Sequence, residues 1–403
     1  MVKKNGVNTN YRRVRQMLPS KYELIEPRFR RWLSVVDAAG SVLFWPWRAG
    51  SRAIDLDAVR SMLVVCNYGL GDAVLSTGCL RALRERFPKA RIDAVAGPRS
   101  AEIVKTFPYF HHVFEVDHPL YRWREGKPPR RREFAAAMRE IRAQRYDVCL
   151  DLLGDLANCW LAFRSGARHR LAHASMGGGF LLTHIVPRDG ARRTQQAILA
   201  EPLALFGIEP REFPLEVFFS DSDASRAAEV LRDGGCRDRP LAVFAPGALH
   251  QAKMWPADRF GRLADLLARE RGMFVCLVGA AGDRAPAEQA AAHGATPMLN
   301  LCGRLALTET VALISRARLF VGNDTGLMHV AAATGVPVVQ LFGPGLPERF
   351  GHHGPHDLIF FDPRCAHHPC SPYSCRIPDQ WCMKNISVEE VFAGICEKIL
   401  PRE

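Results

Sequence analysis

The amino-acid sequence predicts an α/β protein with two doubly wound domains that face each other across a cleft. From Ser61 onward, short β-branched runs alternate with longer segments of helical period, which indicates βαβ units around a parallel sheet. The alternation stops at residues 209–223, EPREFPLEVFFSDSD, and starts again at Leu241. A length of 403 residues is typical of two domains. We expect a ligand in the cleft, at the carboxyl ends of the strands.

The first half contains the clearest βαβ unit. We expect its strand, helix and second strand at residues 62–66, 73–87 and 91–95. Two more strands are expected at residues 112–116 and 146–152, with a helix at residues 133–144 between them. Phe134, Met138 and Ile141 fall on one face of that helix, so this face should pack on the sheet.

The second half repeats the pattern. Strands are expected at residues 241–245, 274–278, 319–322 and 336–342. Helices are expected at residues 258–271, where Gly272 ends the helix, from near Gly326, and at residues 388–400. We therefore divide the chain into an extension at residues 1–60, a first domain at residues 61–215 and a second domain at residues 216–403.

Composition and charge restrict the class of protein. Hydrophobic residues make up 48% and charged residues 24%, which is typical of a folded globular chain. The net charge of +12 favours an anionic partner, such as a nucleic acid, a phosphorylated small molecule or an acidic membrane surface. No apolar run reaches the roughly 18 residues that span a bilayer, and the amino terminus lacks the apolar core of a secretion signal. We expect a cytoplasmic protein.

The first loop that could carry chemistry is the turn Gly69-Leu70-Gly71-Asp72 after the first strand. Its glycines allow a tight turn into a helix, but Val74 stands where a dinucleotide fingerprint has its third glycine, so NAD binding is disfavoured. Asp72 is either a helix cap or a general base that takes a proton from an acceptor hydroxyl.

Two loops of the second half have similar positions. Lys253 lies between Pro246-Gly247 and Trp255-Pro256, where its ammonium group can neutralise a diphosphate; the alternative is a solvated surface lysine. Asp324, Thr325 and Gly326 lead from a strand into a helix of small residues, with His329 one turn along. They suit a nucleotide sugar, or else form a cap with a packed histidine. We interpret neither Asp-x-Asp triplet as a metal site, because the one at residues 55–57 precedes the fold and the one at residues 221–223 opens a helix, where aspartates are common caps.

Together these motifs resemble the glycosyltransferase family that contains the bacterial lipopolysaccharide heptosyltransferases, glycosyltransferase family 9. The blocks that carry the resemblance are PGA-x5-K-x-WP at residues 246–256 and NDTGLMHVAAA at residues 323–333. The resemblance implies a GT-B fold with two Rossmann-like domains, of which the second holds a nucleotide-sugar donor and the first holds the acceptor. It also implies inversion at the anomeric carbon without a required metal.

The resemblance assigns roles to individual residues. It implies that Asp72 is the general base, that Lys253 contacts phosphate, and that the donor site contains Asp324, Thr325, Gly326 and His329. ADP-heptose is the favoured donor, and lipopolysaccharide core or another lipid-linked glycan is the expected acceptor. A catalytically inactive homologue that only binds sugar nucleotides is an alternative.

A basic loop follows the third expected strand. We interpret Arg122, Arg124, Lys127 and Arg130 as a clamp for acidic groups of the acceptor, with a solvated loop as the alternative. The same charges are the argument for a nucleic-acid-binding protein. No nucleic-acid-binding motif accompanies them, so we expect no nucleic-acid partner.

Two further segments remain. Residues 29–48 mix aromatic residues with arginines, which suits either peripheral contact with the inner membrane or an extra helix packed on the first domain.

Cys365, Cys370, Cys375 and Cys382 lie within eighteen residues, in a cysteine-rich segment at residues 365–382. They either hold a structural zinc or iron ion, or they remain reduced, unliganded thiols or form an adventitious disulfide.

Overall fold

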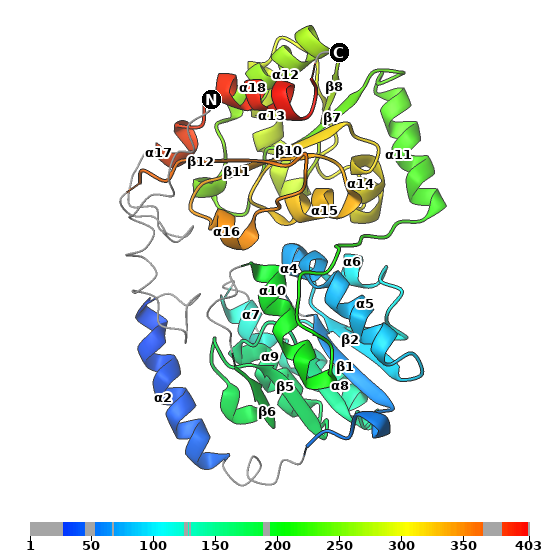
Figure 1. Cartoon of the computed structure of the whole chain (residues 1–403), viewed down its shortest axis with the longest axis vertical. Helices are drawn as coiled ribbons and strands as arrows, with labels where there is room; N and C mark the ends of the chain where they lie inside the picture. The colour runs from blue at the N-terminus through cyan, green and yellow to red at the C-terminus, as the bar shows by residue number, and fades with distance from the viewer. Residues whose placement is uncertain are drawn as a thin grey trace.

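Two parallel sheets, each enclosed by helices, lie one above the other in the computed structural model (Figure 1). The structure describes residues 27–44, 53–66, 68–124, 128, 130–187, 194–365 and 381–401. The first sheet belongs to the first half of the chain and the second sheet to the second half, which confirms the predicted two-domain α/β architecture.

The first sheet has the strand order β3-β2-β1-β4-β5-β6. Its strands are β1 (Ser61–Cys66), β2 (Arg91–Ala96), β3 (His112–Glu115), β4 (Val148–Asp151), β5 (His169–His173) and β6 (His184–Val186). The chain reverses its direction of travel across the sheet between β1 and β4. A doubly wound sheet binds ligands at such a reversal, because the loops on either side diverge there and leave a crevice.

The second sheet has the strand order β12-β11-β10-β7-β8-β9, which is the same topology counted from the opposite edge. Its strands are β7 (Leu241–Ala245), β8 (Phe274–Leu277), β9 (Leu299–Asn300), β10 (Leu319–Asn323), β11 (Val338–Phe342) and β12 (Leu358–Phe361). The reversal lies between β7 and β10. The loops that carry Lys253 and Asp324 follow these two strands.

Strand residues alternate between the two faces of each sheet and so build separate apolar layers. In β1, Leu63 and Val65 pack with the buried face of helix α8, including Phe134, Met138 and Ile141 as expected. Met62 and Val64 face the opposite side and join a cluster that continues into the second sheet. The two domains therefore share apolar contacts.

Helices cover both faces of each sheet. In the first domain they are α4 (Leu70–Leu75), α5 (Thr77–Arg86), α6 (Ala101–Val104), α7 (Pro119–Arg124), α8 (Arg131–Ala143), α9 (Leu156–Arg164) and α10 (Gln195–Ala200). In the second they are α11 (Asp221–Asp233), α12 (Ala257–Arg271), α13 (Arg284–His293), α14 (Leu307–Ile314), α15 (Gly326–Thr334), α16 (Pro347–Phe350), α17 (Trp381–Lys384) and α18 (Val388–Lys398).

The helix expected at residues 73–87 is two helices, α4 and α5, and this is a correction to the sequence analysis. Ser76 is buried at the junction, where its hydroxyl group donates a hydrogen bond to the carbonyl oxygen of Ala73 at 2.8 Å. Local side-chain bonding of this kind competes with regular helix geometry. As a result α4 is a separate short helix.

Capping explains the aspartate triplet at residues 221–223, as predicted, and the structure shows a cap at the triplet at residues 55–57 as well. Ser220 and Asp223 form a reciprocal capping box at the start of α11, and Asp55 accepts a hydrogen bond from the backbone of Asp57. The segment before α11 passes from the first domain to the second and packs on the first, with Phe213 against Gly78.

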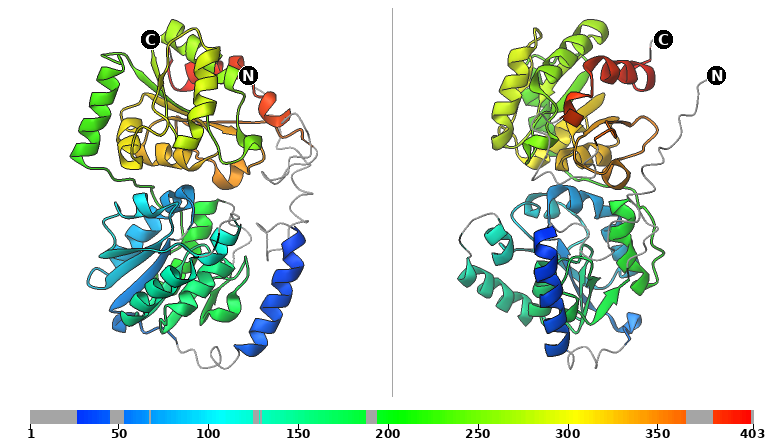
Figure 2. Two further views of the ribbon diagram at one scale, coloured as in Figure 1. Left: turned by 180° about the vertical axis from the view of Figure 1, so that it is seen from behind. Right: turned by 90° about the vertical axis from the view of Figure 1, so that its left-hand side faces the viewer.

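Part of the amino-terminal extension forms helix α2 (Pro27–Leu43), which lies along the outer side of the first domain (Figure 2). Leu33 is buried, and the carboxylate of Asp37 accepts a hydrogen bond from the backbone N–H of Gly178 at 2.8 Å. The Gly40 backbone approaches the ring of Phe180 so closely that a Cβ atom would clash with it. These contacts agree with the expected extra helix on this domain.

Candidate functional site

Two pockets open at the carboxyl ends of the strands. One, of about 800 Å³, lies within the first domain, and the other, of about 720 Å³, lies between the two domains. Gly69 and Asp72 line both pockets. The turn after β1 therefore separates two spaces, each large enough for a sugar or nucleotide ligand.

Asp72 lies in the first turn of α4, whose start at Gly69 has no side-chain cap. The Nε2 atom of Gln195 donates a hydrogen bond to Oδ1 of Asp72 at 3.4 Å. Burial raises the pKa of Asp72 to about 6, and the Arg349 guanidinium group and the Gln195 hydrogen bond oppose this rise. Such a carboxylate is ionised at neutral pH and is basic enough to accept a proton.

Lys253 and Asp324 form an ion pair on the wall of the interdomain pocket. The ammonium group donates to Oδ2 of Asp324 at 2.7 Å and to its carbonyl oxygen at 3.3 Å. An ammonium group has three N–H donors, so one remains for a ligand. A Cβ atom at Gly345 would lie 2.5 Å from Oδ2 of Asp324, which means that the glycine makes room for this carboxylate.

Asn323 holds the two sequence blocks of the second domain together. It is fully buried at the end of β10, where its side chain accepts from the backbone N–H of Trp255 at 3.0 Å and donates to the carbonyl oxygen of Pro246 at 2.8 Å. The indole N–H of Trp255 in turn donates to the carbonyl oxygen of Ile386 at 2.9 Å. These bonds fix the loop that carries Lys253 beside the start of α15.

Thr325 and Gly326 line the interdomain pocket at the amino terminus of α15. Thr325 occupies the N-cap position, but its hydroxyl group makes no capping hydrogen bond. A helix start carries partial positive charge and unpaired N–H groups. Together with Lys253, it gives this part of the pocket the character of an anion site.

His329 does not line either pocket. Its Nδ1 atom is 2.8 Å from Nε2 of His352, and its ring lies against Gly71, where a Cβ atom would be 2.7 Å from Cδ2. Burial, with the neighbouring His352, lowers the pKa of His329 well below its usual value. The structure therefore places this neutral histidine in the contact between α15 and α4, outside the lining of the interdomain pocket.

The predicted basic clamp is described only in part. Arg130 lines the pocket of the first domain, and Arg122 and Arg124 belong to α7, although their side chains lie outside the described residues. Lys127 also lies outside the described residues.

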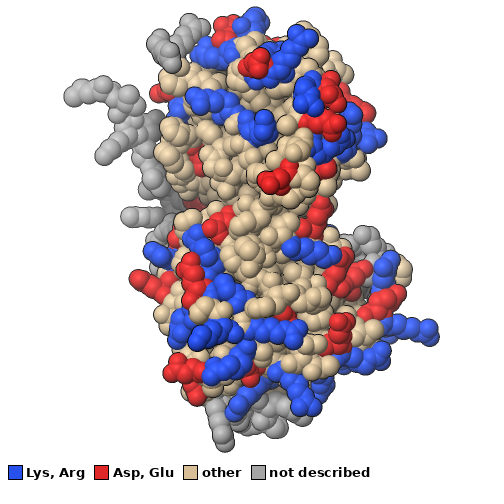
Figure 3. All heavy atoms as spheres, turned by 90° about the vertical axis from the view of Figure 1, so that its right-hand side faces the viewer, with Lys and Arg blue, Asp and Glu red and all other residues tan. Residues whose placement is uncertain are grey.

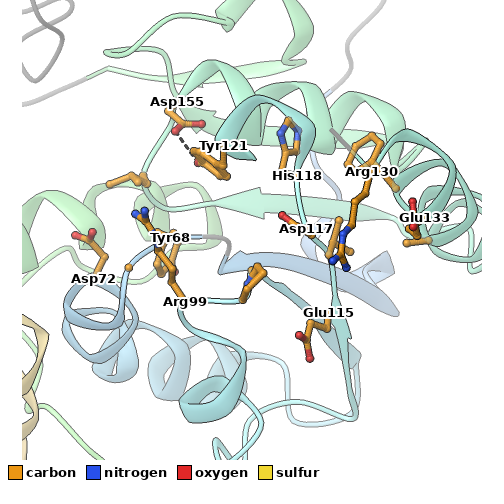
Figure 4. A pocket seen from close by; sticks show the side chains of 17 residues that line it. Tyr68, Asp72, Arg99, Glu115, Asp117, His118, Tyr121, Arg130, Glu133 and Asp155 are labelled. Atoms are coloured by element: carbon orange, nitrogen blue, oxygen red, sulfur yellow. Dashed lines mark hydrogen bonds between the residues drawn. The ribbon is translucent and has the colours of Figure 1, made fainter. Parts of the chain in front are cut away.

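Other polar residues of the first pocket were not found from the sequence (Figure 4). They follow the strand ends: Tyr68 follows β1, Arg99 follows β2, His118 follows β3 and Asp155 follows β4. The hydroxyl group of Tyr121 donates to Asp155 at 2.6 Å. The rule that doubly wound sheets bind ligands at their carboxyl edge could have identified these positions once the strands were known.

The cysteine cluster is also described only in part. Cys365 follows β12 and Cys382 lies in α17, whereas Cys370 and Cys375 lie outside the described residues. Within the described part of the chain, no group of three potential metal ligands occurs. The metal prediction therefore stays a prediction.

The fold and the site define an enzyme class. The chain forms two Rossmann-like domains, with a carboxylate between two pockets and an anion site at the start of α15. These are the features of a GT-B glycosyltransferase. The family model of glycosyltransferase family 9 (heptosyltransferase) matches residues 134–379. This match covers more than half of the chain, and the chain belongs to this family of glycosyltransferases.

A curated relative agrees with this assignment, and solved structures agree with the fold. Lipooligosaccharide heptosyltransferase 2 of Haemophilus ducreyi is 27% identical over 302 residues, which cover 71% of this chain and 84% of the relative. A glycosyltransferase family 9 structure from Veillonella parvula superposes with a TM-score of 0.73 at 23% identity, covering 87% of this chain and 99% of the other. The ADP-heptose lps heptosyltransferase II of E. coli gives 0.68 at 23% identity, covering 84% and 98%.

Proposed function

We propose that this enzyme transfers heptose from ADP-heptose to a lipopolysaccharide core or a related lipid-linked glycan. The position of Asp72 carries the proposal, because this residue lines both the pocket of the first domain and the pocket between the domains. The names of the relatives support the sugar. The polar lining of both pockets, with Lys253 in one and Arg99 and Arg130 in the other, supports charged and hydroxyl-bearing substrates.

In the proposed reaction Asp72 takes a proton from the acceptor hydroxyl group. The acceptor oxygen forms a bond to the anomeric carbon of heptose while the bond from that carbon to the ADP oxygen breaks. Attack from the side opposite the leaving group inverts the anomeric configuration. The proton ends on Asp72, and ADP leaves with the negative charge of the broken bond.

Lys253 and the start of α15 stabilise the leaving diphosphate in this proposal. The ammonium group lies on the pocket wall with one N–H donor not used by Asp324, and the N–H groups of the first turn at Gly326 provide further donors. Preorganised donors of this kind stabilise charge that develops in the transition state. We therefore propose that transfer requires no metal ion.

The acceptor is proposed to occupy the pocket of the first domain. Arg99 and Arg130 can pair with acidic groups of the acceptor, while Glu133, Asp155 and Tyr121 offer hydrogen bonds to sugar hydroxyl groups (Figure 4). Arg130 belongs to the proposed clamp, whose other members, Arg122, Arg124 and Lys127, precede it in the chain.

We also propose that α2 contacts the cytoplasmic face of the inner membrane. Trp32, Val35, Val42 and Leu43 are 56%, 67%, 77% and 69% exposed, and Arg31 is the one charged residue among the exposed described positions of this helix. A helix that packs on its domain with one face and presents apolar side chains and an arginine on the other suits an anionic interface. No helix in the described chain has the length and apolar character needed to cross a bilayer.

The charge distribution bears on the nucleic-acid alternative. On the face shown in Figure 3, basic side chains occur on both domains and are interspersed with acidic ones. A nucleic-acid-binding surface usually presents a more continuous basic stripe or patch. We therefore retain the proposal of a phosphorylated donor and a lipid-linked acceptor.

For the cysteine cluster we propose a structural zinc or iron site that takes no part in transfer. Elemental analysis of protein purified without a histidine tag tests this. We expect close to one metal ion per chain; less than about a tenth of an equivalent, with four titratable thiols at residues 365–382, contradicts the site.

The proposed function is tested by mass spectrometry of products. The enzyme is incubated with ADP-heptose and a core-deficient lipopolysaccharide acceptor, and in parallel with other nucleotide sugars. We expect an acceptor that has gained one heptose and an equal amount of ADP. Transfer of a different sugar, or none with any acceptor of this class, contradicts the proposal.

A further inference from the structure

A buried polar chain crosses from the second domain to Asp72. The Nε atom of Arg349, in α16, donates to Oε1 of Gln195 at 2.8 Å, and Nε2 of Gln195, in α10, donates to Oδ1 of Asp72 at 3.4 Å. Gln195 is 1% exposed and Arg349 is 7% exposed. Neither residue lines the pocket between the domains or the pocket of the first domain.

The chemistry of the amide makes this chain directional. Because the guanidinium group can only donate, it fixes the carbonyl oxygen of Gln195 toward itself and the amide N–H₂ toward Asp72. The carboxylate therefore receives a hydrogen bond on Oδ1 from a side chain that cannot flip without losing its bond to Arg349. A charge-assisted bond in a buried place also strengthens its neighbours by polarising them.

We propose that Gln195 and Arg349 are positioning residues for Asp72, and that Arg349 orients the base through Gln195 only while the two domains are in contact. This inference rests on the proposed role of Asp72 as the base. In this proposal a residue of the donor-binding domain completes the acceptor side of the site. A GT-B enzyme of this kind would activate its base as the domains close.

Other charges also act on Asp72 and must be kept constant in a test. Lys253 lowers its pKa and Asp324 raises it, while Arg99 and Asp155 line the adjoining pocket. Arg349 is the strongest of the charged groups that favour the ionised carboxylate. Replacing Arg349 should therefore make Asp72 harder to ionise without removing a residue from either pocket.

The experiment measures the ionisation of Asp72 directly, by NMR of protein carrying carboxyl-¹³C aspartate, with Asp72→Asn to assign the signal. In Arg349→Met the titration midpoint should rise by about one pH unit relative to wild type, and Arg349→Lys should recover part of the difference. Gln195→Ala should raise the midpoint as well. Equal midpoints in wild type, Arg349→Met and Gln195→Ala overturn the proposal.

A parallel kinetic measurement separates this proposal from the proposed function. The rate of transfer by Arg349→Met should fall about threefold at pH 6.5 and approach roughly a tenfold loss near pH 5, but recover toward wild type at pH 8, with ADP affinity within a few-fold of wild type. A loss that is equal at all pH values indicates a purely structural role and contradicts the proposal. If wild type transfers no heptose but the NMR midpoints still differ, the proposed function fails and the positioning role stands.

Discussion

At the scale of single residues, the site depends on carboxylates whose environments differ. Asp324 is paired with a lysine, whereas Asp72 is only partly exposed, accepts a hydrogen bond from a neutral amide and has its pKa raised to about 6. Asp324 holds the ammonium group of Lys253 in place, whereas Asp72 can accept a proton. Their roles in donor binding and in proton transfer follow from this difference.

Lys253→Ala should weaken ADP binding by roughly ten- to a hundredfold, because one charge-assisted contact to the diphosphate is lost. The same change leaves Asp324 without its ion-pair partner, so part of the loss will come from that carboxylate. Isothermal titration calorimetry with ADP measures the effect. Lys89→Ala, at an exposed position of the first domain, is the control and should bind ADP as wild type does. Unchanged affinity in Lys253→Ala would count against this donor site.

At the scale of elements, two short helices from different domains meet in the centre of the molecule. The contact between α4 and α15 depends on Gly71 and Gly326, since a Cβ atom at Gly71 would approach His329 and one at Gly326 would lie 2.9 Å from Leu70. This close approach sets the distance between Asp72 and the anion site at the start of α15. The absence of a Cβ atom at Gly71 also leaves room for the ring of His329 in this contact.

Gly71→Ala should force α4 and α15 apart and reduce transfer by roughly ten- to a hundredfold, because a displacement of about 1 Å between reacting groups has that effect. Gly282→Ala is the matched control, since nothing lies within 4 Å of a Cβ atom there and the backbone does not require glycine. Steady-state rates of both variants check this. Transfer by Gly71→Ala at the rate of the control would show that the contact does not set the geometry.

The outward face of α2 gives a second prediction for an element. Val35→Asp combined with Val42→Asp should weaken binding to vesicles rich in anionic phospholipid by at least about tenfold, because two apolar side chains no longer enter the interface and two negative charges are added. The control combines Ile185→Asp and Phe219→Asp, which add the same charge at exposed apolar positions elsewhere. Vesicle co-sedimentation should separate the two proteins. Equal binding by both would reject the membrane proposal.

At the scale of the whole molecule, the long periodic segments and the glycine-containing loops were sufficient to predict the two domains and the loops at the cleft. Strands such as β9, with two residues, and β5, with histidine at both ends, lack an apolar pattern and were missed. Gln195 and Arg349 could not be predicted either. They lie in short helices 154 residues apart, and only the packing of one domain on the other brings them together.

The central claim is that Asp72 is the base that serves both pockets, and Asp72→Asn tests it most directly. The amide keeps the shape of the side chain but cannot take the proton, so transfer should fall by at least about a hundredfold. ADP affinity, measured by calorimetry on the same preparation, should stay within a few-fold of wild type because the diphosphate contacts are unchanged. Transfer by Asp72→Asn at more than about a tenth of the wild-type rate, with ADP binding intact, would contradict the account.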